Sequence, residues 1–416
     1  MKYRNKKYLG ERMLTMLCLK NAFLVDGTGQ NPQEGVTVVV QGKTIVQVGR
    51  DITIPEDAQV IDLKHKPLLP GFSDAHTHLG GSDSLDRPGL TSRFANYNYA
   101  QNREAALEWG VTAVRSAGDF TPEILEFRDE VNEGKFRSPR ILACGRFIQA
   151  QNGYPGYAVF SADQNILDNA MVLVNDQTDI EAEVKKLVEA GVDFIKTVIS
   201  DDNKMDYPNS VPRLSNEQLK RIADAAHKYG KRLMVHVDDL KDMAEAIAIG
   251  ADTIEHIISV GSSNHELTDE LLKTLTSRDV WVVPTMIAIK NHDAMPGIPP
   301  VYATLEKVVR EFIKAGVKIG VGCDSGIPFV PYGECVHLEM ELLTEAGMSP
   351  LAAITAATGG NAKMFGQEHF FGTVEPGKAA DLVVLGSNPL QDIKNTRDIK
   401  MVLRDGRIVV DKLLNN

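Results

Sequence analysis

The segment LLPGFSDAHTH, residues 68–78, begins as an apolar strand and ends in two histidines. Side chains alternate along a strand, so His76 and His78 lie on the same side of it and are able to chelate one cation. Taken alone, such a pair is a weak signal for a metal site. Its meaning depends on where the strand lies in the fold, and the flanking segments predict that.

From this strand to about residue 325, short apolar strands alternate with amphipathic helical patterns. This alternation predicts right-handed crossovers and a parallel sheet. Eight units in about 260 residues match the usual size of a (β/α)₈ TIM-type barrel, so the fold class is α/β. An open doubly wound sheet is the alternative, but no glycine-rich nucleotide motif follows any strand. The eight expected strands cover residues 68–78, 111–117, 140–148, 194–200, 232–238, 253–257, 281–287 and 318–325.

The two ends of the chain have a different pattern from the middle. Both hold short β-type runs separated by turn residues, and Asp405-Gly406 between two apolar runs indicates a tight hairpin. Neither end is long enough to form a core by itself, so we expect them to pair into one small β-sandwich domain. The expected organisation is a loose tail at 1–16, a β-sandwich domain at 17–67 plus 371–416, and a barrel at 68–370.

Bulk properties exclude some classes of partner. The net charge of −11 disfavours nucleic acid, which requires a basic face. No apolar run approaches the length of a membrane span, so no membrane partner is expected. The four cysteines have no CxxC spacing, and we expect free thiols in a reducing compartment, which predicts a cytoplasmic protein.

Ionisable residues occur at the same end of several expected barrel strands. His236 ends the fifth strand, His256 the sixth and Asp324 the eighth, and the carboxyl ends of barrel strands are where active sites form. A single buried histidine is usually a satisfied core residue, and an aspartate before Ser-Gly is usually a turn residue. Their joint position beside His76 and His78 instead favours a site for zinc or a related divalent ion.

Lys196 lies inside the fourth expected strand, FIKTVIS, where a buried positive charge is costly. An ion pair with a nearby carboxylate is one explanation. The other is that the neutral amine has reacted with CO₂ to form a carbamate. That anionic group has two oxygens and could bridge two cations that share a hydroxide.

At this point the chain resembles the amidohydrolase superfamily, most closely its prolidase and imidazolonepropionase-like branch. The resemblance extends from about Leu17 onward and rests on LPGFSDAHTHL, GVTAVRSAG, GADTIEHI, GVKIGVGCDSG and GTVEPGKAADLVVL in family order. It implies a split β-sandwich beside the barrel, and an assembly of identical subunits.

The resemblance also implies roles for six ligands of two divalent metal ions, with zinc as the default. His76, His78 and Asp324 would hold one ion, His236 and His256 the other, and carboxylated Lys196 would bridge them. Asp324 would also carry the proton from water to the leaving amine. Attack by the bridging hydroxide would then cleave the bond.

The loops expected around the pocket depart from the family pattern. QAQNGYPGYAVF follows the third strand, His236-Val-Asp238-Asp239 the fifth, and Pro331-Tyr332-Gly333 the eighth. The residues expected to bind substrate are Arg115, Tyr154, Tyr157, Asp238 and Tyr332. For Arg115 a structural salt bridge is the alternative to binding a carboxylate. Asp239 is expected to cap the following helix.

These features predict hydrolysis of an amide-type C–N bond in a small molecule. A dipeptide of Xaa-Pro type, an N-acyl amino acid, or a related carbamate or urea would fit. The alternative enzyme is a deaminase or a cyclic amidine or imidazolone ring hydrolase with a single metal, against which Lys196 argues. A barrel that binds a ligand without catalysis is a third possibility, but all six ligands are present.

Overall fold

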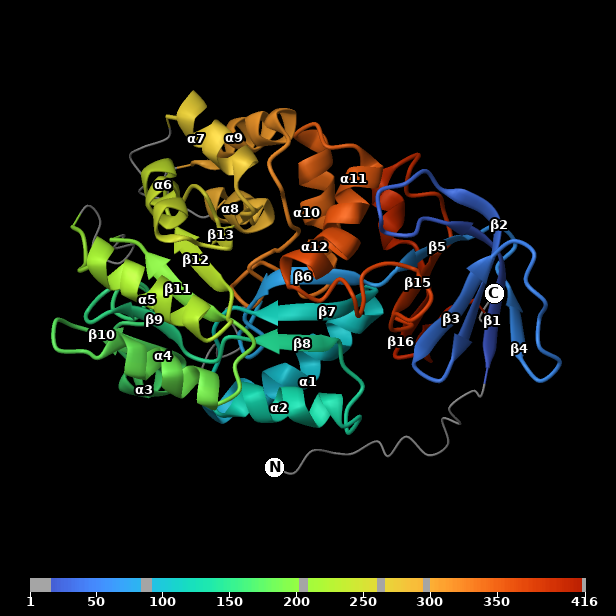
Figure 1. Ribbon diagram of the computed structural model, residues 1–416, viewed down its shortest axis with the longest axis horizontal. Helices are drawn as coiled ribbons and strands as arrows, with labels where there is room; N and C mark the ends of the chain where they lie inside the picture. The colour runs from blue at the N-terminus through green and yellow to red at the C-terminus, as the bar shows by residue number, and fades with distance from the viewer. Residues whose placement is uncertain (1–15, 84–91, 202–208, 260–265, 295–299, 414–416) are drawn as a thin grey trace.

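The computed structural model describes residues 16–83, 92–201, 209–259, 266–294 and 300–413. Helices surround parallel strands over most of the molecule, and a β layer lies at one end, which is a TIM-barrel-like α/β arrangement (Figure 1). The tail expected at 1–16 lies outside the described residues except for Met16. No helix among the described residues is both long and apolar enough to cross a bilayer.

The strands are β1 (Leu17–Leu24), β2 (Gln33–Gln41), β3 (Thr44–Gly49), β4 (Gln59–Asp62), β5 (Pro67–Pro70), β6 (Phe72–Thr77), β7 (Val111–Ser116), β8 (Arg140–Ala143), β9 (Phe147–Ala150), β10 (Met171–Val174), β11 (Ile195–Ile199), β12 (Leu233–Val237), β13 (Thr253–Glu255), β14 (Trp281–Val283), β15 (Leu382–Leu385), β16 (Ile399–Arg404) and β17 (Arg407–Asp411). The helices are α1 (Ser92–Glu108), α2 (Glu123–Asn132), α3 (Gln164–Ala170), α4 (Ile180–Glu189), α5 (Asn216–Lys228), α6 (Leu240–Ile249), α7 (Asp269–Ser277), α8 (Met286–Asp293), α9 (Tyr302–Ala315), α10 (Glu334–Glu345), α11 (Pro350–Thr355), the π-helical turn η1 (Ala356–Gly360), α12 (Asn361–Met364) and the 3₁₀ turn η2 (Ile393–Arg397).

The strands of the middle region form two parallel sheets. One has the order β10-β9-β11-β12-β13-β14 and the other the order β6-β7-β8. The expected strand at 140–148 is divided into β8 and β9, and β10 was not predicted because its run MVLV is short. The expected strand at 318–325 forms only isolated bridges, which join Val282 to Ile319 on one side and Thr77 to Ser325 on the other.

A glycine explains how this eighth segment packs so closely against β6. A Cβ atom on Gly322 would lie 2.8 Å from the backbone nitrogen of His76, closer than real contacts allow. The segment also exchanges backbone hydrogen bonds with β6, from Ala75 N to Val321 O and from Asp324 N to His76 O. The close approach therefore fixes Asp324 beside the end of β6.

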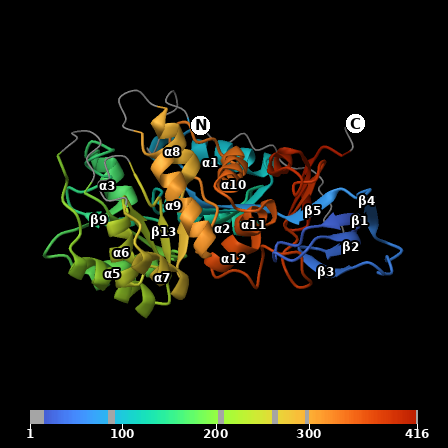
Figure 2. The same cartoon turned by 90° about the horizontal axis from the view of Figure 1, so that it is seen from above.

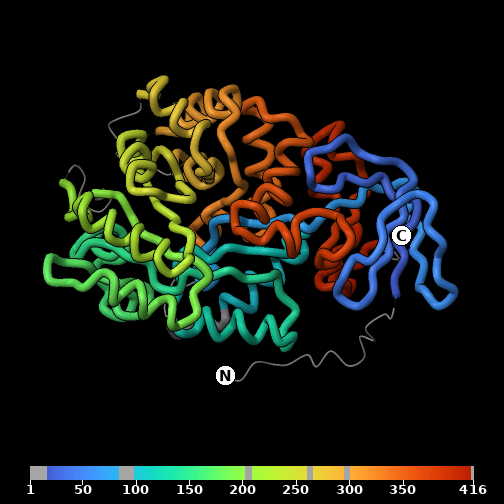
Figure 3. Tube along the Cα trace, in the orientation of Figure 1, coloured from blue at the N-terminus to red at the C-terminus, as the bar shows by residue number. Residues whose placement is uncertain are grey.

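The two ends of the chain meet in one eight-stranded sheet. Its order is β17-β16-β15-β5-β1-β2-β3, with β4 paired to the other end of β1, and Leu68 of β5 lies opposite Val384 of β15. Figure 3 shows the blue and red ends of the tube side by side, and Figure 2 shows this sheet extending from one end of the molecule. Apolar residues from both ends form a separate core beneath it. The two-layered sandwich and its residue limits stay a prediction.

The expected strand at 68–78 is divided at Gly71, which separates β5 of the terminal sheet from β6 of the parallel sheet. The backbone passes so close to β7 that a Cβ atom on Gly71 would lie 2.0 Å from Oγ1 of Thr112. The apolar pattern is continuous through the bend because both strands are buried. A single segment thus connects the terminal sheet directly to the histidine pair.

Several helix ends have the residues that local capping rules favour. Ser215 and Gln218 form both hydrogen bonds of a capping box at the start of α5, and Asp239 caps α6. Gly250 and Gly316 end α6 and α9 in left-handed conformations. The predicted turn at Asp405-Gly406 has positive φ at both residues and connects β16 to β17.

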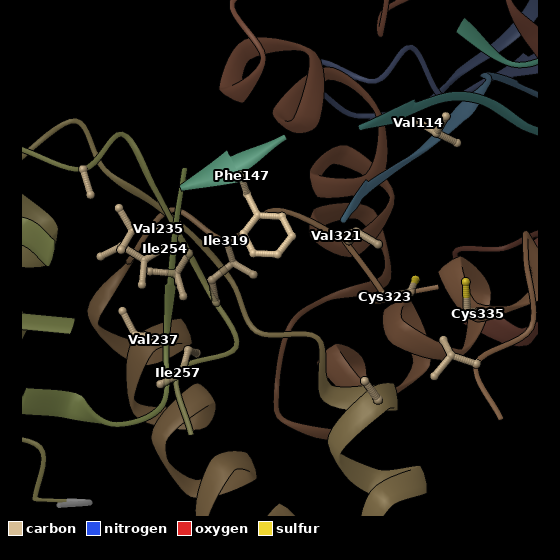
Figure 4. Packing of buried hydrophobic residues seen from close by; sticks show 14 of the residues in the cluster. Val114, Phe147, Val235, Val237, Ile254, Ile257, Ile319, Val321, Cys323 and Cys335 are labelled. Atoms are coloured by element: carbon tan, nitrogen blue, oxygen red, sulfur yellow. The ribbon is translucent and has the colours of Figure 1, made fainter. Parts of the chain in front are cut away.

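The strands of the parallel sheets pack against buried apolar side chains. Val235 of β12 and Ile254 of β13 lie beside Phe147 of β9 and Ile319 of the eighth segment, and all four are buried (Figure 4). Val235 and Ile254 alternate with His236 and Glu255 along their strands, so they lie on the face opposite to these site residues. The strands are therefore held rigidly, and the polar residues at their carboxyl ends have fixed positions.

His337 on α10 predicts how stability depends on pH. Its Nε2 donates to the carbonyl of Trp109 at 2.8 Å, and its Nδ1 lies 2.9 Å from the hydroxyl of Thr396. Burial lowers the pKa of His337 to about 4. Between that value and its ordinary pKa the unfolded chain binds the proton and the folded chain does not, so stability is full above pH 6.5 and falls by up to about 3 kcal/mol as pH drops to 4.

Urea unfolding of the native protein at pH 7 and pH 5 measures this loss of stability. The His337→Gln variant, which cannot be protonated, should have a smaller difference between the two pH values. An identical difference in both proteins would contradict the assignment.

Candidate active site

His76 and His78 lie at the end of β6 with their Nδ1 atoms held by acceptors. Nδ1 of His76 is 2.9 Å from Oε2 of Glu255, and Nδ1 of His78 is 2.7 Å from the carbonyl oxygen of Gly118. Nδ1 therefore carries the proton in each ring, and Nε2 keeps its lone pair. Burial lowers the pKa of His76 well below its ordinary value, and the neighbouring Asp324 opposes this shift.

Asp324 lies against both of these lone pairs. Its Oδ1 is 3.5 Å from Nε2 of His76 and 3.4 Å from Nε2 of His78. Burial by itself would raise the pKa of Asp324, but the surrounding histidines outweigh it and hold the pKa well below its ordinary value. The side chain is therefore a carboxylate in the folded protein.

The backbone at the end of β13 makes two overlapping three-residue turns. Ile257 N donates to Glu255 O at 3.1 Å and Ile258 N to His256 O at 2.9 Å, with φ of 77° at His256 and 74° at Ile257. Such turns are rare and strained, particularly for a β-branched residue. The surrounding fold maintains this strain, and it brings the His256 ring to 4.7 Å from the His76 ring, measured between centroids.

The hydroxyl of Thr285 orients the ring of His256 through its Nδ1 atom. Thr285 has a φ of 48°, and its Oγ1 lies 2.9 Å from Nδ1 of His256. The carboxylate of Glu339 accepts hydrogen bonds from Met286 N at 2.9 Å and Ile287 N at 2.8 Å, and so caps α8 directly after Thr285. The buried Glu339 thereby stabilises the turn that carries the Thr285 hydroxyl.

Lys196 of β11 reaches the same group of side chains. It is 4% exposed, and its Nζ is 3.3 Å from Nε2 of His76. Among the described residues it forms no ion pair with a carboxylate, which was the alternative explanation for a buried lysine. Burial lowers the pKa of Lys196, so the neutral amine that carbamate formation needs is more populated than in water.

His236 lies beside this group but is oriented differently. Its ring centroid is 4.4 Å from that of His256, and its Nε2 is 3.1 Å from Oδ1 of Asp238. The ring of Tyr154 covers the His236 ring at 5.1 Å. The structure thus brings together the Nε2 atoms of His76 and His78 with Asp324, Lys196 and His256, whereas Nε2 of His236 bonds to Asp238.

The geometry of Arg115 corrects the expectation that it binds a substrate carboxylate. Its Nη2 lies 2.8 Å from Oε1 of Glu255, its Nε donates to the carbonyl of Ala75 at 2.7 Å, and Nη1 lies 3.2 Å from Oγ1 of Thr253. The guanidinium is buried and its donors are used within the protein. The structural salt bridge is therefore the better description of Arg115.

The remaining loop residues lie in two different environments. Tyr332 is buried, and its hydroxyl donates to the carbonyl of His78, so it supports the backbone of the histidine pair. Tyr157 is 38% exposed. Glu255 and Thr285, which orient His76 and His256, were not among the residues predicted from the sequence. Glu255 carried a usable signal, because a carboxylate inside an apolar strand needs a buried partner.

A second polar cluster lies directly behind the histidine pair. Oδ1 of Asp74 accepts hydrogen bonds from the backbone nitrogens of His76 and Cys323, and Oδ2 accepts from the hydroxyl of Ser325 and from Sγ of Cys335. These four bonds use the acceptor positions of the carboxylate and connect β6 to the eighth segment.

All four cysteines of the chain are buried free thiols, as the sequence predicted.

The donor set at the convergence point fits a divalent metal. His76, His256 and Asp324 each offer a ligand atom, and these atoms lie within 4.8 Å of one another. Neutral imidazoles and a carboxylate are the donors that zinc and similar cations prefer. The Nδ1 hydrogen bonds to Glu255 and to the Gly118 carbonyl are also typical of histidines that bind metal.

Comparison with known proteins identifies the class that this fold and site define. The amidohydrolase family model matches residues 68–409, and the chain belongs to the amidohydrolase family. The protein is accordingly a hydrolase that acts on carbon–nitrogen bonds.

Several relatives match over nearly the whole chain. Ochratoxinase from Aspergillus niger is 26% identical over 91% of this chain and 83% of its own. Imidazolonepropionase from Symbiobacterium thermophilum is 25% identical over 97% and 93%. The crystal structure of an Xaa-Pro dipeptidase with methionine in its active site has a TM-score of 0.81 at 25% identity, covering 94% of this chain and 99% of that one.

The pair formed by Glu255 with His76 and Arg115 makes a testable prediction. Glu255→Gln keeps the side-chain volume but removes the charge that orients His76 and pairs with Arg115. Substitutions at such positions typically cost about 10- to 100-fold in metal affinity or activity. We expect weaker zinc retention during dialysis and a lower kcat. Glu341→Gln on the outer helix α10 is the control, and retention equal to that of the native protein would contradict this role.

Proposed function

We propose that the protein hydrolyses an amide-type C–N bond of a small molecule with the help of two divalent metal ions, zinc by default. The substrate classes are dipeptides of Xaa-Pro type, N-acyl amino acids, and related carbamates or ureas. The observation that carries the proposal is the position of Asp324 between Nε2 of His76 and Nε2 of His78, with Nζ of Lys196 at 3.3 Å from the former.

The residues that would hold the ions are His76, His78, His236, His256 and Asp324, with Lys196, carboxylated by CO₂, between them. When bound, such ions lower the pKa of water and polarise a substrate carbonyl. Because its pKa is low, Asp324 is ionised and accepts the proton of the attacking water, then returns it to the leaving nitrogen. His236 joins the set when Asp238 releases its Nε2.

The names of the relatives support this choice of bond. Prolidase and ochratoxinase structures resemble this chain over 95% or more of its length. Imidazolonepropionase and a methylthioadenosine deaminase also match, and they favour ring opening or deamination at a single metal as the second candidate. Lys196 separates the two, because a single-metal site has no use for a bridging carbamate.

A substrate screen of zinc-loaded protein tests the proposal. A library of dipeptides and N-acyl amino acids should contain members that are hydrolysed, with about two metal ions per chain and activity that rises with bicarbonate. One metal ion per chain together with ammonia release would favour the deaminase. If no member of the library is hydrolysed, carbamates, ureas or ring compounds become the favoured substrates.

Four expectations from the sequence stay proposals beside this one. The two parallel sheets and the eighth segment would form one closed (β/α)₈ barrel, and the terminal sheet would be a β-sandwich domain. The chain would assemble with copies of itself, which light scattering after size exclusion measures. Its location would be cytoplasmic.

A further inference from the structure

Few large apolar side chains are exposed in the part of the chain that the structure describes, and most of them follow strands of the parallel sheets. Among the described residues they are Val60, Tyr157, Val159, Phe329 and Phe370. Tyr157 and Val159 follow β9, and Phe329 follows the eighth segment. The carboxyl ends of barrel strands lie at one end of the fold, so these three residues belong to the end that carries the histidines.

Phe329 combines exposure with backbone strain. Its side chain is 46% exposed, and its φ is 69°, in the left-handed region that a bulky residue rarely adopts. Glycine or asparagine would fit such a position more easily. A residue strained for structural reasons would be expected to be buried, whereas nearly half of the surface of Phe329 is exposed. Strain of this kind is characteristic of ligand-binding positions.

Hydrogen bonds fix Phe329 at the rim of the site. Ser325 O accepts from His78 N, Gly326 O accepts from Ser82 N, and Phe329 N donates to Asp83 O at 2.9 Å. This series runs outward from the histidine pair along the loop after β6. Asn291 at the end of α8 donates to the carbonyl of Phe329 at 2.7 Å. Phe329 is therefore held from both sides, five residues after Asp324.

We propose that Phe329 determines substrate specificity by contacting an apolar side chain next to the scissile bond. This inference rests on the proposed function and names its substrate class: amides that carry a large aliphatic or aromatic group. Because hydrogen bonds hold the backbone of Phe329, the ring can contact such a group at a reduced entropic cost. A small or charged group would leave the ring in water.

The experiment compares substrates that differ at one side chain. Zinc-loaded protein is assayed with dipeptides and N-acetyl amino acids in which alanine is replaced by leucine or phenylalanine. We expect kcat/KM to favour the large side chain by about tenfold or more. Phe329→Asn keeps the left-handed backbone but removes the ring, and should reduce that preference to about twofold. Phe329→Leu should retain most of the preference.

Phe370→Asn is the matched control, because Phe370 is also exposed but lies over Arg140 at the other end of the barrel strands. It should leave the preference unchanged. Phe329→Asn should not lower the melting temperature, since the strain is relieved, whereas loss of a structural contact would lower it. Equal preference in native protein and Phe329→Asn, or a change of oligomeric state in Phe329→Asn, would overturn the inference.

Calorimetric binding of N-acetylphenylalanine and N-acetylalanine separates this inference from the proposed function. Affinity that depends on Phe329 without any hydrolysis would support the inference and contradict the proposed reaction. Hydrolysis with no dependence on Phe329 would support the proposed reaction and contradict the inference about Phe329.

Discussion

Under the proposed two-metal mechanism, Lys196→Ala should lose one of two metal ions per chain and about a thousandfold or more in kcat/KM. Nζ of Lys196 is buried at 3.3 Å from Nε2 of His76, and no other described lysine lies in the group around Asp324. Without the carbamate, two cations in one small site would repel each other with no anion between them. Effects of this size are usual when a group that organises a catalytic metal site is removed.

Alanine also leaves a cavity, so a second variant is needed. Lys196→Met keeps the length of the side chain without its nitrogen, and should be folded but equally inactive. Lys231→Ala is the control, because Lys231 is a partly buried lysine whose Nζ donates to the carbonyl of Val192. Protein prepared with ¹³C-labelled bicarbonate should show a carbamate carbon signal that is absent from Lys196→Met. A Lys196→Ala protein with two metal ions and full activity would exclude the carbamate.

Asp324→Asn should lower kcat by about a thousandfold with a much smaller change in KM. Asparagine has the shape of aspartate and tolerates the φ of 61° found at this position, so the backbone should be unchanged. It cannot accept a proton, and it removes the negative charge beside His76 and His78. General base catalysis and charge stabilisation are therefore lost together.

The pH profile distinguishes a proton acceptor from a structural residue. Because His76, His78 and His256 hold the pKa of Asp324 well below its ordinary value, the native protein should keep its general base ionised down to acidic pH. The residual activity of Asp324→Asn should rise with hydroxide concentration instead. Asp405→Asn, which also has a positive φ, at 50°, lies in the terminal hairpin and should leave kcat unchanged. A similar loss in that control would show a general effect on folding.

The order of ionisable residues on successive strands was sufficient to predict a TIM-barrel-like α/β fold and the convergence of several of these side chains. His76, His78 and Asp324 converge as that order implied. The left-handed turns at His256 and Thr285 could not be predicted, because their strain is maintained by packing and by the distant Glu339. Local propensities describe only a residue and its neighbours along the chain.

Arg115 shows the corresponding limit for substrate binding. An arginine at the end of a strand reads equally well as a ligand for a carboxylate or as a buried ion pair. Only the position of Glu255, which comes from a different strand, decides between the two. Tyr332 was likewise expected to bind substrate, but its hydroxyl donates to the carbonyl of His78, which is on a different segment of the chain.

The pairing of Leu68 with Val384 also has a consequence for synthesis on the ribosome. β5 emerges early and β15 near the end of translation, so one edge of β5 has no partner while the region between them is being made. An unpaired apolar edge is a template for association with other chains. Nascent chains that stall before β15 should therefore require chaperones, and premature stop codons in this region should yield insoluble protein even though every site residue has been translated.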